Sequence, residues 1–274
     1  MKEGYWVVRT YEAGAIGEKT KFWVQGTRPS SRSKRKERAE IKKQEQNEYS
    51  AQKQLARLIN ANFTQGDLLL GLDYSPAGMD RLGKYIAEHP FQTDGCEDPE
   101  AEQMEQIRQA AEREMRLALR RVKRELAKEG VALRYIAITS DMDGDTGEAV
   151  RVHHHLIVPA EAKEAFVEKW KDLGSVNWSP MSAQADYTPI AEYFIRQVRR
   201  VPDAKKYISS RNLVRPQPKD RVVLSDAEVR VPKGGQLLHR NEFKPGRPQY
   251  IRYVLPEDRW KRAKIPPDSG GGTA

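Results

Sequence analysis

The alternation of apolar and polar residues predicts a hairpin at the start of the chain and a long helix after it. Residues 5–11 and 21–24 are rich in aromatic and β-branched side chains and flank a turn that contains glycine, as two paired strands do. Residues 30–60 are polar and helical in composition, and they end in apolar positions at helical spacing, Leu55, Leu58 and Ile59. We therefore expect a helix with a basic first half and a buried end.

The middle of the chain alternates between strand and helix patterns. Residues 68–74 form an apolar run closed by Ser-Pro-Ala-Gly, as in a buried strand that ends in a turn, and residues 99–128 have the composition of a long helix. Strands are predicted over 133–139 and 150–158, joined by an acidic turn at 141–145. Helices at 160–173 and 188–200 flank a short extended stretch at 175–178.

The order of these elements predicts the fold class. From Leu68 it is strand, helix, strand, strand, helix, strand, helix, which matches a split βαβ, or ferredoxin-like, antiparallel sheet with helices on one face. We expect an α+β protein with an N-terminal hairpin and basic helix (1–62), a central domain (63–216), a basic C-terminal subdomain (217–265) and a disordered tail (266–274). Short strands are expected within that subdomain at 221–224 and 249–254.

Charge narrows the class of partner. The 274 residues include 48 Lys and Arg against 39 Asp and Glu, a formal charge of +9, which favours a polyanion such as nucleic acid. Ribosome binders, chaperones and membrane-surface proteins share this balance. The lone Cys96 cannot form an internal disulfide, and neither an N-terminal apolar run nor a bilayer-length apolar stretch is present, so we expect a cytoplasmic protein with no membrane partner.

The most informative stretch is a predicted strand with three consecutive histidines. Side chains alternate between the faces of a strand, so His153 and His155 point together while His154 points away. Two imidazoles on one face can bind one metal ion and leave coordination positions open. Packing is the alternative explanation, and it explains a single histidine better than this pair.

A third ligand is expected from the acidic turn. Asp141, Asp143 and Asp145 could each bring a carboxylate to the metal, or could serve solubility alone, and we favour Asp141. The run resembles the start of a calcium loop. It lacks the glycine at the sixth position and the glutamate at the twelfth, so an EF-hand is excluded.

A tyrosine on the helix at 188–200 is the candidate nucleophile. Ile190, Phe194 and Val198 form an apolar stripe, and Tyr193 lies outside it. The same side carries three other polar residues, Arg196, Gln197 and Arg200. A surface tyrosine in a basic helix would be unremarkable by itself, but its position after the paired histidines favours a role in chemistry.

These residues resemble a family. His153-His154-His155 followed by Tyr193-Phe194-Ile195-Arg196 is similar to the HUH endonucleases among the rolling-circle replication initiators of phages and plasmids. The strand 68–74 resembles the family's opening motif. Residues 62–67, and 210–213 followed by Pro216, are similar to initiators from Gram-positive hosts. The resemblance covers about residues 47–216, with arginine at position 196 where the family usually has lysine and Ser140 near the place of a family glutamate.

The resemblance implies an enzyme that nicks and rejoins DNA. Tyr193 would attack a phosphate of a single-stranded origin hairpin, with Arg196 beside it, and Mg²⁺ or Mn²⁺ would be held by His153, His155 and Asp141. The product would be a 5′-phosphotyrosine and a free 3′-OH, and reversal would join strands without ATP. Cations expected to bind DNA are Arg199, Arg200, Arg211, Lys34, Arg35 and Lys36.

Other functions remain open. A transposase or relaxase would use the same chemistry, and a non-catalytic nucleic-acid-binding protein would need the histidines only for structure. A metalloprotease is disfavoured because no His-Glu-x-x-His helix is present. No Walker A loop is present either, so a helicase would have to be a separate protein, such as one from the host.

Overall fold

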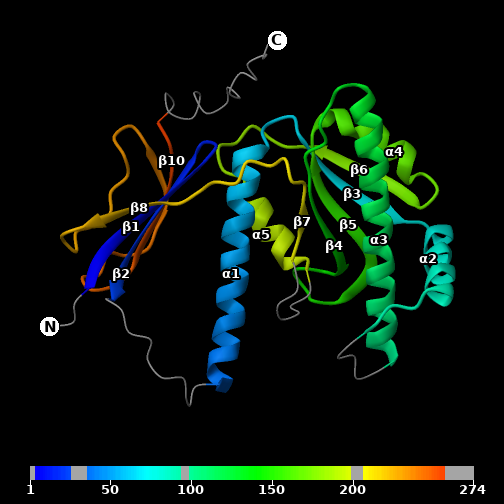
Figure 1. Cartoon of the computed structure of the whole chain (residues 1–274), viewed down its shortest axis with the longest axis horizontal. Helices are drawn as coiled ribbons and strands as arrows, with labels where there is room; N and C mark the ends of the chain where they lie inside the picture. Colours follow the sequence, from blue (N-terminus) through cyan, green and yellow to red (C-terminus); the bar gives the residue numbers. More distant parts are fainter. Residues whose placement is uncertain (1–3, 26–35, 94–98, 199–205, 257–274) are drawn as a thin grey trace, which may run out of the picture. The chain divides into compact units, whose positions relative to one another are not determined.

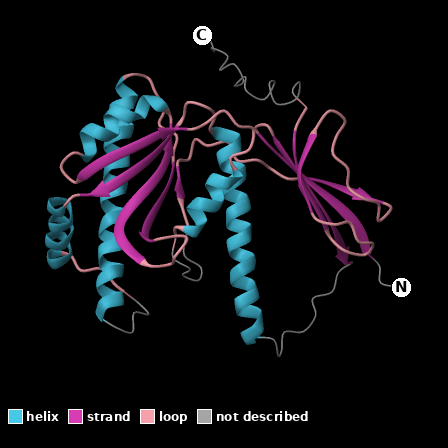
Figure 2. Cartoon of the chain, turned by 180° about the vertical axis from the view of Figure 1, so that it is seen from behind, coloured by secondary structure: helices cyan, strands magenta, loops and turns pink. Residues whose placement is uncertain are grey.

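The protein is an α+β structure with two five-stranded antiparallel sheets and, among the described residues, five α-helices (Figures 1 and 2). A computed structural model describes residues 4–25, 36–93, 99–198 and 206–256. The chain divides into two compact units. In the part of the chain that is described, no helix is long and apolar enough to cross a membrane.

The first unit combines strands from the N-terminal and C-terminal parts of the described chain in one sheet. It comprises residues 1–62, 185–188 and 214–274. The strand order is β8-β1-β2-β10-β9, with bounds β1 Gly4–Ala13, β2 Ile16–Gln25, β8 Lys219–Val223, β9 Gln236–Arg240 and β10 Gln249–Val254. The predicted hairpin is therefore present as β1 and β2. The predicted boundaries at 62 and 217 stay predictions, but strands from both sides of them share this sheet.

Helix α1 (Lys36–Asn62) belongs to the same unit. Leu55, Leu58 and Ile59 are buried, which confirms the expected apolar end. Arg57 pairs with Glu18 of β2 at 2.6 Å, with both side chains largely buried. Lys34 and Arg35 lie outside the described residues, and only the helical backbone of Lys36 is described, so a DNA contact by these cations stays a prediction.

The second unit, residues 63–184 and 189–213, holds the other sheet. Its strand order is β6-β3-β5-β4-β7, with bounds β3 Leu68–Tyr74, β4 Ile136–Met142, β5 Ala149–Val158, β6 Gly174–Pro180 and β7 Ile208–Ser209. Its helices are α2 (Pro76–Glu88), α3 (Pro99–Lys128), α4 (Lys163–Trp170) and most of α5 (Thr188–Arg196). The predicted helix at 160–173 is shorter than expected because its first turn, Ala160–Ala162, is a 3₁₀ turn.

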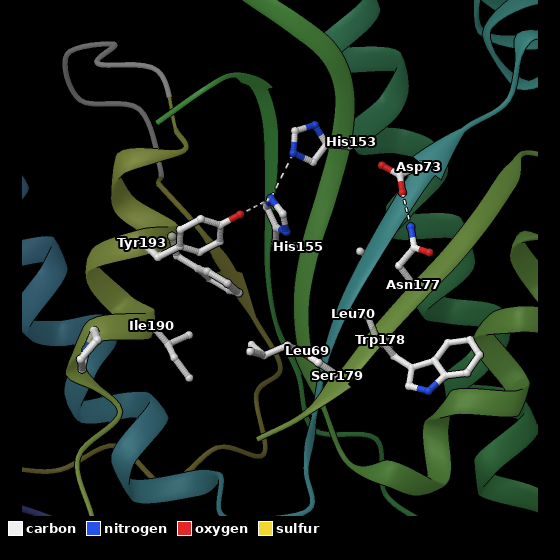
Figure 3. A pocket seen from close by; sticks show the side chains of 13 residues that line it. Leu69, Leu70, Asp73, His153, His155, Asn177, Trp178, Ser179, Ile190 and Tyr193 are labelled. Atoms are coloured by element: carbon white, nitrogen blue, oxygen red, sulfur yellow. Dashed lines mark hydrogen bonds between the residues drawn. The ribbon is translucent and has the colours of Figure 1, made fainter. Parts of the chain in front are cut away.

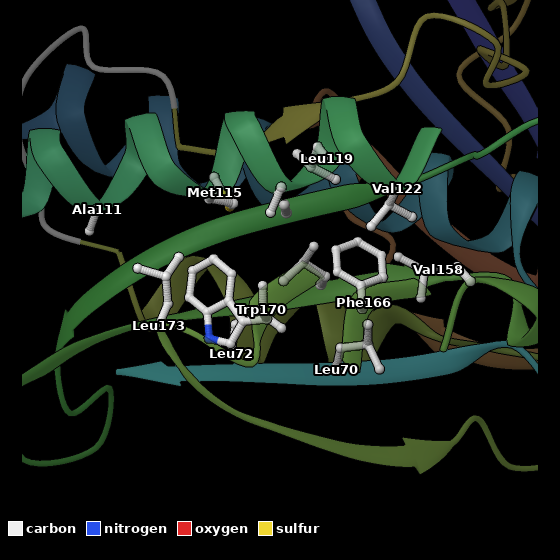
Figure 4. Close-up of a cluster of buried hydrophobic side chains, with 14 of the residues drawn as sticks. Leu70, Leu72, Ala111, Met115, Leu119, Val122, Val158, Phe166, Trp170 and Leu173 are labelled. Atoms are coloured by element: carbon white, nitrogen blue, oxygen red, sulfur yellow. The ribbon is translucent and has the colours of Figure 1, made fainter. Parts of the chain in front are cut away.

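One face of this sheet packs on α2, α3 and α4. Alternate residues of β3 are buried, and Leu70 and Leu72 meet Phe166 and Trp170 of α4 in the core beneath α3 (Figure 4). The other face carries α5, because Phe194 of that helix lies against a histidine that points away from this core. Helices therefore cover both faces, whereas the sequence predicts them on one.

Helix α2 is absent from the sequence prediction, which takes Ser75-Pro76-Ala77-Gly78 for a turn. In the structure Ser75 is the N-cap of α2, and its hydroxyl oxygen accepts a hydrogen bond from the backbone N–H of Gly78 at 3.1 Å. Pro76 occupies the first helical position, where its missing N–H costs nothing. The serine and proline that end the strand thus also begin a helix.

Candidate metal and tyrosine site

The alternation of β5 separates the three histidines as predicted. His154 is fully buried on the face covered by α3 and α4, and His153 and His155 lie half-buried on the opposite face. The two faces differ in surroundings: one is the packed core and the other is an open groove. His154 therefore has surroundings different from those of His153 and His155.

His154 is a structural residue. Its Nε2 lies 3.0 Å from the Tyr74 hydroxyl and its Nδ1 lies 2.9 Å from the Thr139 hydroxyl. Tyr74 can donate its proton to the carbonyl of Ala111 while accepting one from His154, so all these polar atoms are satisfied. Burial, together with the neighbouring histidines, lowers the pKa of His154 to about 3, so the buried ring is neutral.

Replacing His154 with alanine is expected to destabilise the fold by about 2–4 kcal/mol, because it leaves a cavity and removes a hydrogen-bond partner from each of two buried hydroxyls, those of Tyr74 and Thr139. Urea unfolding followed by circular dichroism would measure the loss. His153→Ala, on the open face, should change the free energy of unfolding by no more than about 0.5 kcal/mol. Equal stabilities for the two variants would contradict this division of roles.

His153 and His155 converge on one point. Their Nε2 atoms are 3.0 Å apart, at hydrogen-bond distance, and His153 Nδ1–H donates to the carbonyl of Arg151 at 2.9 Å, so the lone pair of His153 Nε2 points toward His155 (Figure 3). Two nitrogens bound to one ion at about 2.1 Å and at right angles are about 3 Å apart. The pair therefore fits two adjacent positions of one metal ion.

The surroundings of His155 favour the neutral, metal-binding form of its ring. Burial, and next the charge of His153, lower the pKa of His155 to about 4, while Asp73 acts in the opposite direction. A neutral imidazole is the form that binds a metal. At neutral pH His155 therefore needs no deprotonation before it can act as a ligand.

Tyr193 lies beside the same histidine. Its hydroxyl is 3.3 Å from His155 Nε2, and the two rings meet edge to face with centroids 5.3 Å apart (Figure 3). Helix α5 buries Ala191 and Phe194 and leaves the tyrosine 39% exposed. The phenol thus projects from the helix into the groove that the two histidines line.

Neighbouring groups have opposing effects on the pKa of Tyr193. Burial, and next the carboxylates of Asp143 and Asp145, raise the pKa of the phenol, while Arg196 lowers it. Arg196 is itself paired with Asp145 at 3.2 Å, and both side chains are exposed. The predicted cation is therefore present near the tyrosine, but in this structure it is bound to the acidic turn.

The groove has a volume of about 690 Å³ and two chemically different parts. One part holds His153, His155, Tyr193 and Asp73. The remainder of its lining is largely apolar or uncharged, and comprises Leu69, Leu70, Gly71, Asn177, Trp178, Ser179, Pro189, Ile190 and Phe194. A volume of this size suits a small organic group or a short part of a larger ligand.

Asp73 is the carboxylate that the sequence analysis missed. It lies directly opposite His153 in the register between β3 and β5, so the two side chains share a face. Asn177 of β6 donates to its Oδ2 at 2.7 Å and holds the carboxylate toward the groove. The spacing along the chain gives no sign of this pairing, because the register joins strands about eighty residues apart.

Asp141, the third metal ligand that the sequence favours, lies outside the groove. It lies within β4 at an irregularity in the pairing, is 5% exposed, and interacts electrostatically with Arg108 of α3. Ser140 is the residue opposite His153, and Asp141 is not part of the groove lining. Among the described residues, no group of three or more His, Cys, Asp and Glu side chains is arranged to hold a metal ion.

The remaining predicted residues are not brought to the groove. Asp143 accepts hydrogen bonds from the backbone N–H groups of Asp145 and Thr146 and so shapes the turn. Gln197, predicted on the open side of the helix, is buried and accepts a hydrogen bond from Ser140. Arg211 is exposed in the turn after β7. Two further cations, Arg199 and Arg200, lie outside the described residues.

Comparison of the chain with family models, with curated proteins and with solved structures found no match. The function must therefore be argued from the groove itself.

Proposed function

We propose that this protein is a replication initiator of the HUH type, which nicks single-stranded DNA and rejoins it. The observation that carries the proposal is the meeting of three groups in one open groove. His153 and His155 present nitrogens 3.0 Å apart, and the Tyr193 hydroxyl lies 3.3 Å from one of them. A phenol beside two imidazoles that could share a metal ion is the set of groups that metal-assisted attack on a DNA phosphate would need.

The two imidazoles would hold a divalent ion, Mg²⁺ or Mn²⁺. Such an ion would neutralise and orient a phosphate and favour the phenolate over the phenol. Asp73, kept in place by Asn177, adds negative charge on the same side of the groove and so favours a cation there. We assign the carboxylate role to Asp73 and no longer to Asp141, because only Asp73 lines the groove.

The tyrosine would supply the reaction itself. Its oxygen would attack the phosphorus of a phosphodiester, forming a Tyr–O–P bond while the bond from phosphorus to the 3′-oxygen breaks. The phenol proton leaves the tyrosine and the departing 3′-oxygen gains a proton, so atoms balance. Because one phosphodiester replaces another, a 3′-OH can reverse the step and join strands.

The finer fold assignment belongs to this proposal. The four long strands after Leu68 have the order β6-β3-β5-β4, with antiparallel pairing throughout. This is the order expected of a ferredoxin-like sheet built from strand, helix, strand, strand, helix, strand. We infer that β7 and α5 are additions to that arrangement, and that α5 brings the tyrosine to the open face.

A single incubation tests the proposal. The protein is mixed with Mn²⁺ and a set of single-stranded hairpin oligonucleotides drawn from candidate origins, and a covalent adduct is sought on a denaturing gel. We expect an adduct that survives boiling in detergent and disappears when EDTA is present from the start. Binding of the same oligonucleotides without any adduct would favour the non-catalytic alternative.

A further inference from the structure

Three neighbouring strands, β5, β3 and β6, form the floor of the groove, and the residue at its centre has no side chain. Residues directly opposite each other on neighbouring strands share a face. Along this face β5 presents His153, His155 and Ile157, β3 presents Asp73, Gly71 and Leu69, and β6 presents Ser175, Asn177 and Ser179. Gly71 is therefore the central position, and it alone among the nine has no side chain.

The fold gives no reason for a glycine at this position. A Cβ added to Gly71 would meet only the Cβ of Asn177, at 3.8 Å, which is ordinary contact, and the backbone is not in the left-handed region. By contrast, a Cβ at Gly78 or Gly174 would collide with backbone atoms. Glycine in the interior of a strand weakens it and often marks a site where another molecule approaches the backbone closely.

We propose that the part of the groove directly over Gly71, called the hollow below, is a binding site for one unstacked nucleobase. That base belongs to a nucleotide next to the phosphate that Tyr193 attacks. This inference rests on the proposed function. Neighbouring strands are about 4.8 Å apart, so a group lying on Gly71 is one strand spacing from His155. That separation is suitable for a base whose own phosphate reaches the histidines and the tyrosine.

The rim of the hollow suits a base rather than a second phosphate. A flat ring can lie on the bare backbone of Gly71, with the apolar side chains of Leu69 and Ile190 available to its face or edge. The amide of Asn177 can hydrogen-bond a base edge. Asp73, whose carboxylate would repel a phosphate, lies on the remaining side. No lysine or arginine is among the described residues that line the groove, so a second phosphate would find no cationic side chain there.

The proposal is tested by a substitution that fills the space over Gly71 with a side chain. Gly71→Val places a β-branched side chain where the base would lie, and valine is favourable in a strand, so the melting temperature should stay the same or rise. We expect affinity for an oligonucleotide that the parent cleaves to fall about tenfold or more, as when one good contact is lost. Mn²⁺ affinity, measured by calorimetry, should remain that of the parent. Gly71→Ala should have a smaller effect in the same direction.

A matched change in the DNA locates the contact. In oligonucleotides with an abasic site placed in turn on either side of the nick, the parent should lose affinity at one position. At that position Gly71→Val should bind no more weakly than the parent, because the base that it displaces is already absent. Gly83→Ala is the control, since Gly83 is exposed on α2, outside the groove, and has nothing within 4 Å of an added Cβ.

Each result decides a separate question. If no oligonucleotide gives an adduct with the parent protein, the proposed function fails. If the parent cleaves and Gly71→Val binds and cleaves equally well, the proposal of a nucleobase-binding site over Gly71 is wrong. A fall in Mn²⁺ affinity in the variant would also overturn it, because the substitution would then act through the metal site. Should Gly71→Val not fold, the same comparison with Gly71→Ala decides the matter.

Discussion

Tyr193→Phe is expected to abolish the covalent adduct and strand cleavage while DNA binding and stability remain. The substitution removes one oxygen atom, and that oxygen is the one we propose to attack phosphorus. The side chain is 39% exposed and packs by its ring on His155, which phenylalanine preserves. The free energy of unfolding should therefore change by no more than about 0.5 kcal/mol. Cleavage and adduct are measured on denaturing gels, and binding by fluorescence anisotropy.

The control is Tyr49→Phe, because Tyr49 is the exposed tyrosine of α1 and lies outside the groove. It should cleave as the parent does. Mass spectrometry of the nuclease-trimmed adduct identifies the attached residue. A mark on Tyr187 or Tyr207 would refute the assignment of Tyr193 and leave the class of enzyme standing. An adduct that forms unchanged in Tyr193→Phe would have the same meaning.

The double variant His153→Ala with His155→Ala is expected to lose measurable Mn²⁺ binding and cleavage together. The two nitrogens are the converging donors of the groove, and removing both leaves Asp73 as its nearest carboxylate. Neither histidine belongs to the packed core, so the fold should persist. Isothermal titration with Mn²⁺ measures the affinity, and we expect a fall of more than about 100-fold, since loss of a residue that only supports a metal ligand already costs about 10- to 100-fold.

The matched control uses the two histidines outside this strand. His89→Ala with His239→Ala removes the same number of imidazoles and should leave Mn²⁺ affinity and cleavage unchanged. Mn²⁺ affinity that is equal in the parent and in the His153 and His155 double variant would place the metal elsewhere. Adding Asp73→Asn to the series tests the carboxylate that lines the groove, and a weaker affinity is expected there.

Local patterns in the sequence predict those features of the structure that depend on residues close together along the chain, such as single strands and helices. The strand 68–74 and the helix 99–128 have the predicted bounds, because one is a compact apolar run and the other is an uninterrupted stretch of helix formers. The separation of His154 from its neighbours followed from alternation alone. Helix α2 was missed because serine and proline begin helices as well as turns.

Those local patterns do not predict which residues of strands far apart in the sequence lie opposite each other. Asp141 is predicted as a ligand because it belongs to the acidic turn that joins the two strands, yet in the structure it lies within β4, at an irregularity in the pairing, and interacts with Arg108. Asp73 and Gly71 reach the groove only through the register of β3 with β5 and β6. No local signal fixes such a register, since it is set by the packing of the whole sheet.

The sheet of the first unit constrains how the protein can be shortened. Its inner strands β1 and β2 come from residues 4–25, and they are flanked by β8 and β10 from residues 219–254. A deletion of the first 45 residues, made to remove the basic run that leads into α1, would also remove two inner strands and expose the edges of their former neighbours. Charge-neutralising substitutions between residues 32 and 38 would examine that run with the sheet intact. Residues 63–213, in contrast, contain every strand of the second sheet and the whole groove, and only residues 185–188 of that stretch belong to the first unit, so a minimal fragment for the proposed nicking should be sought there.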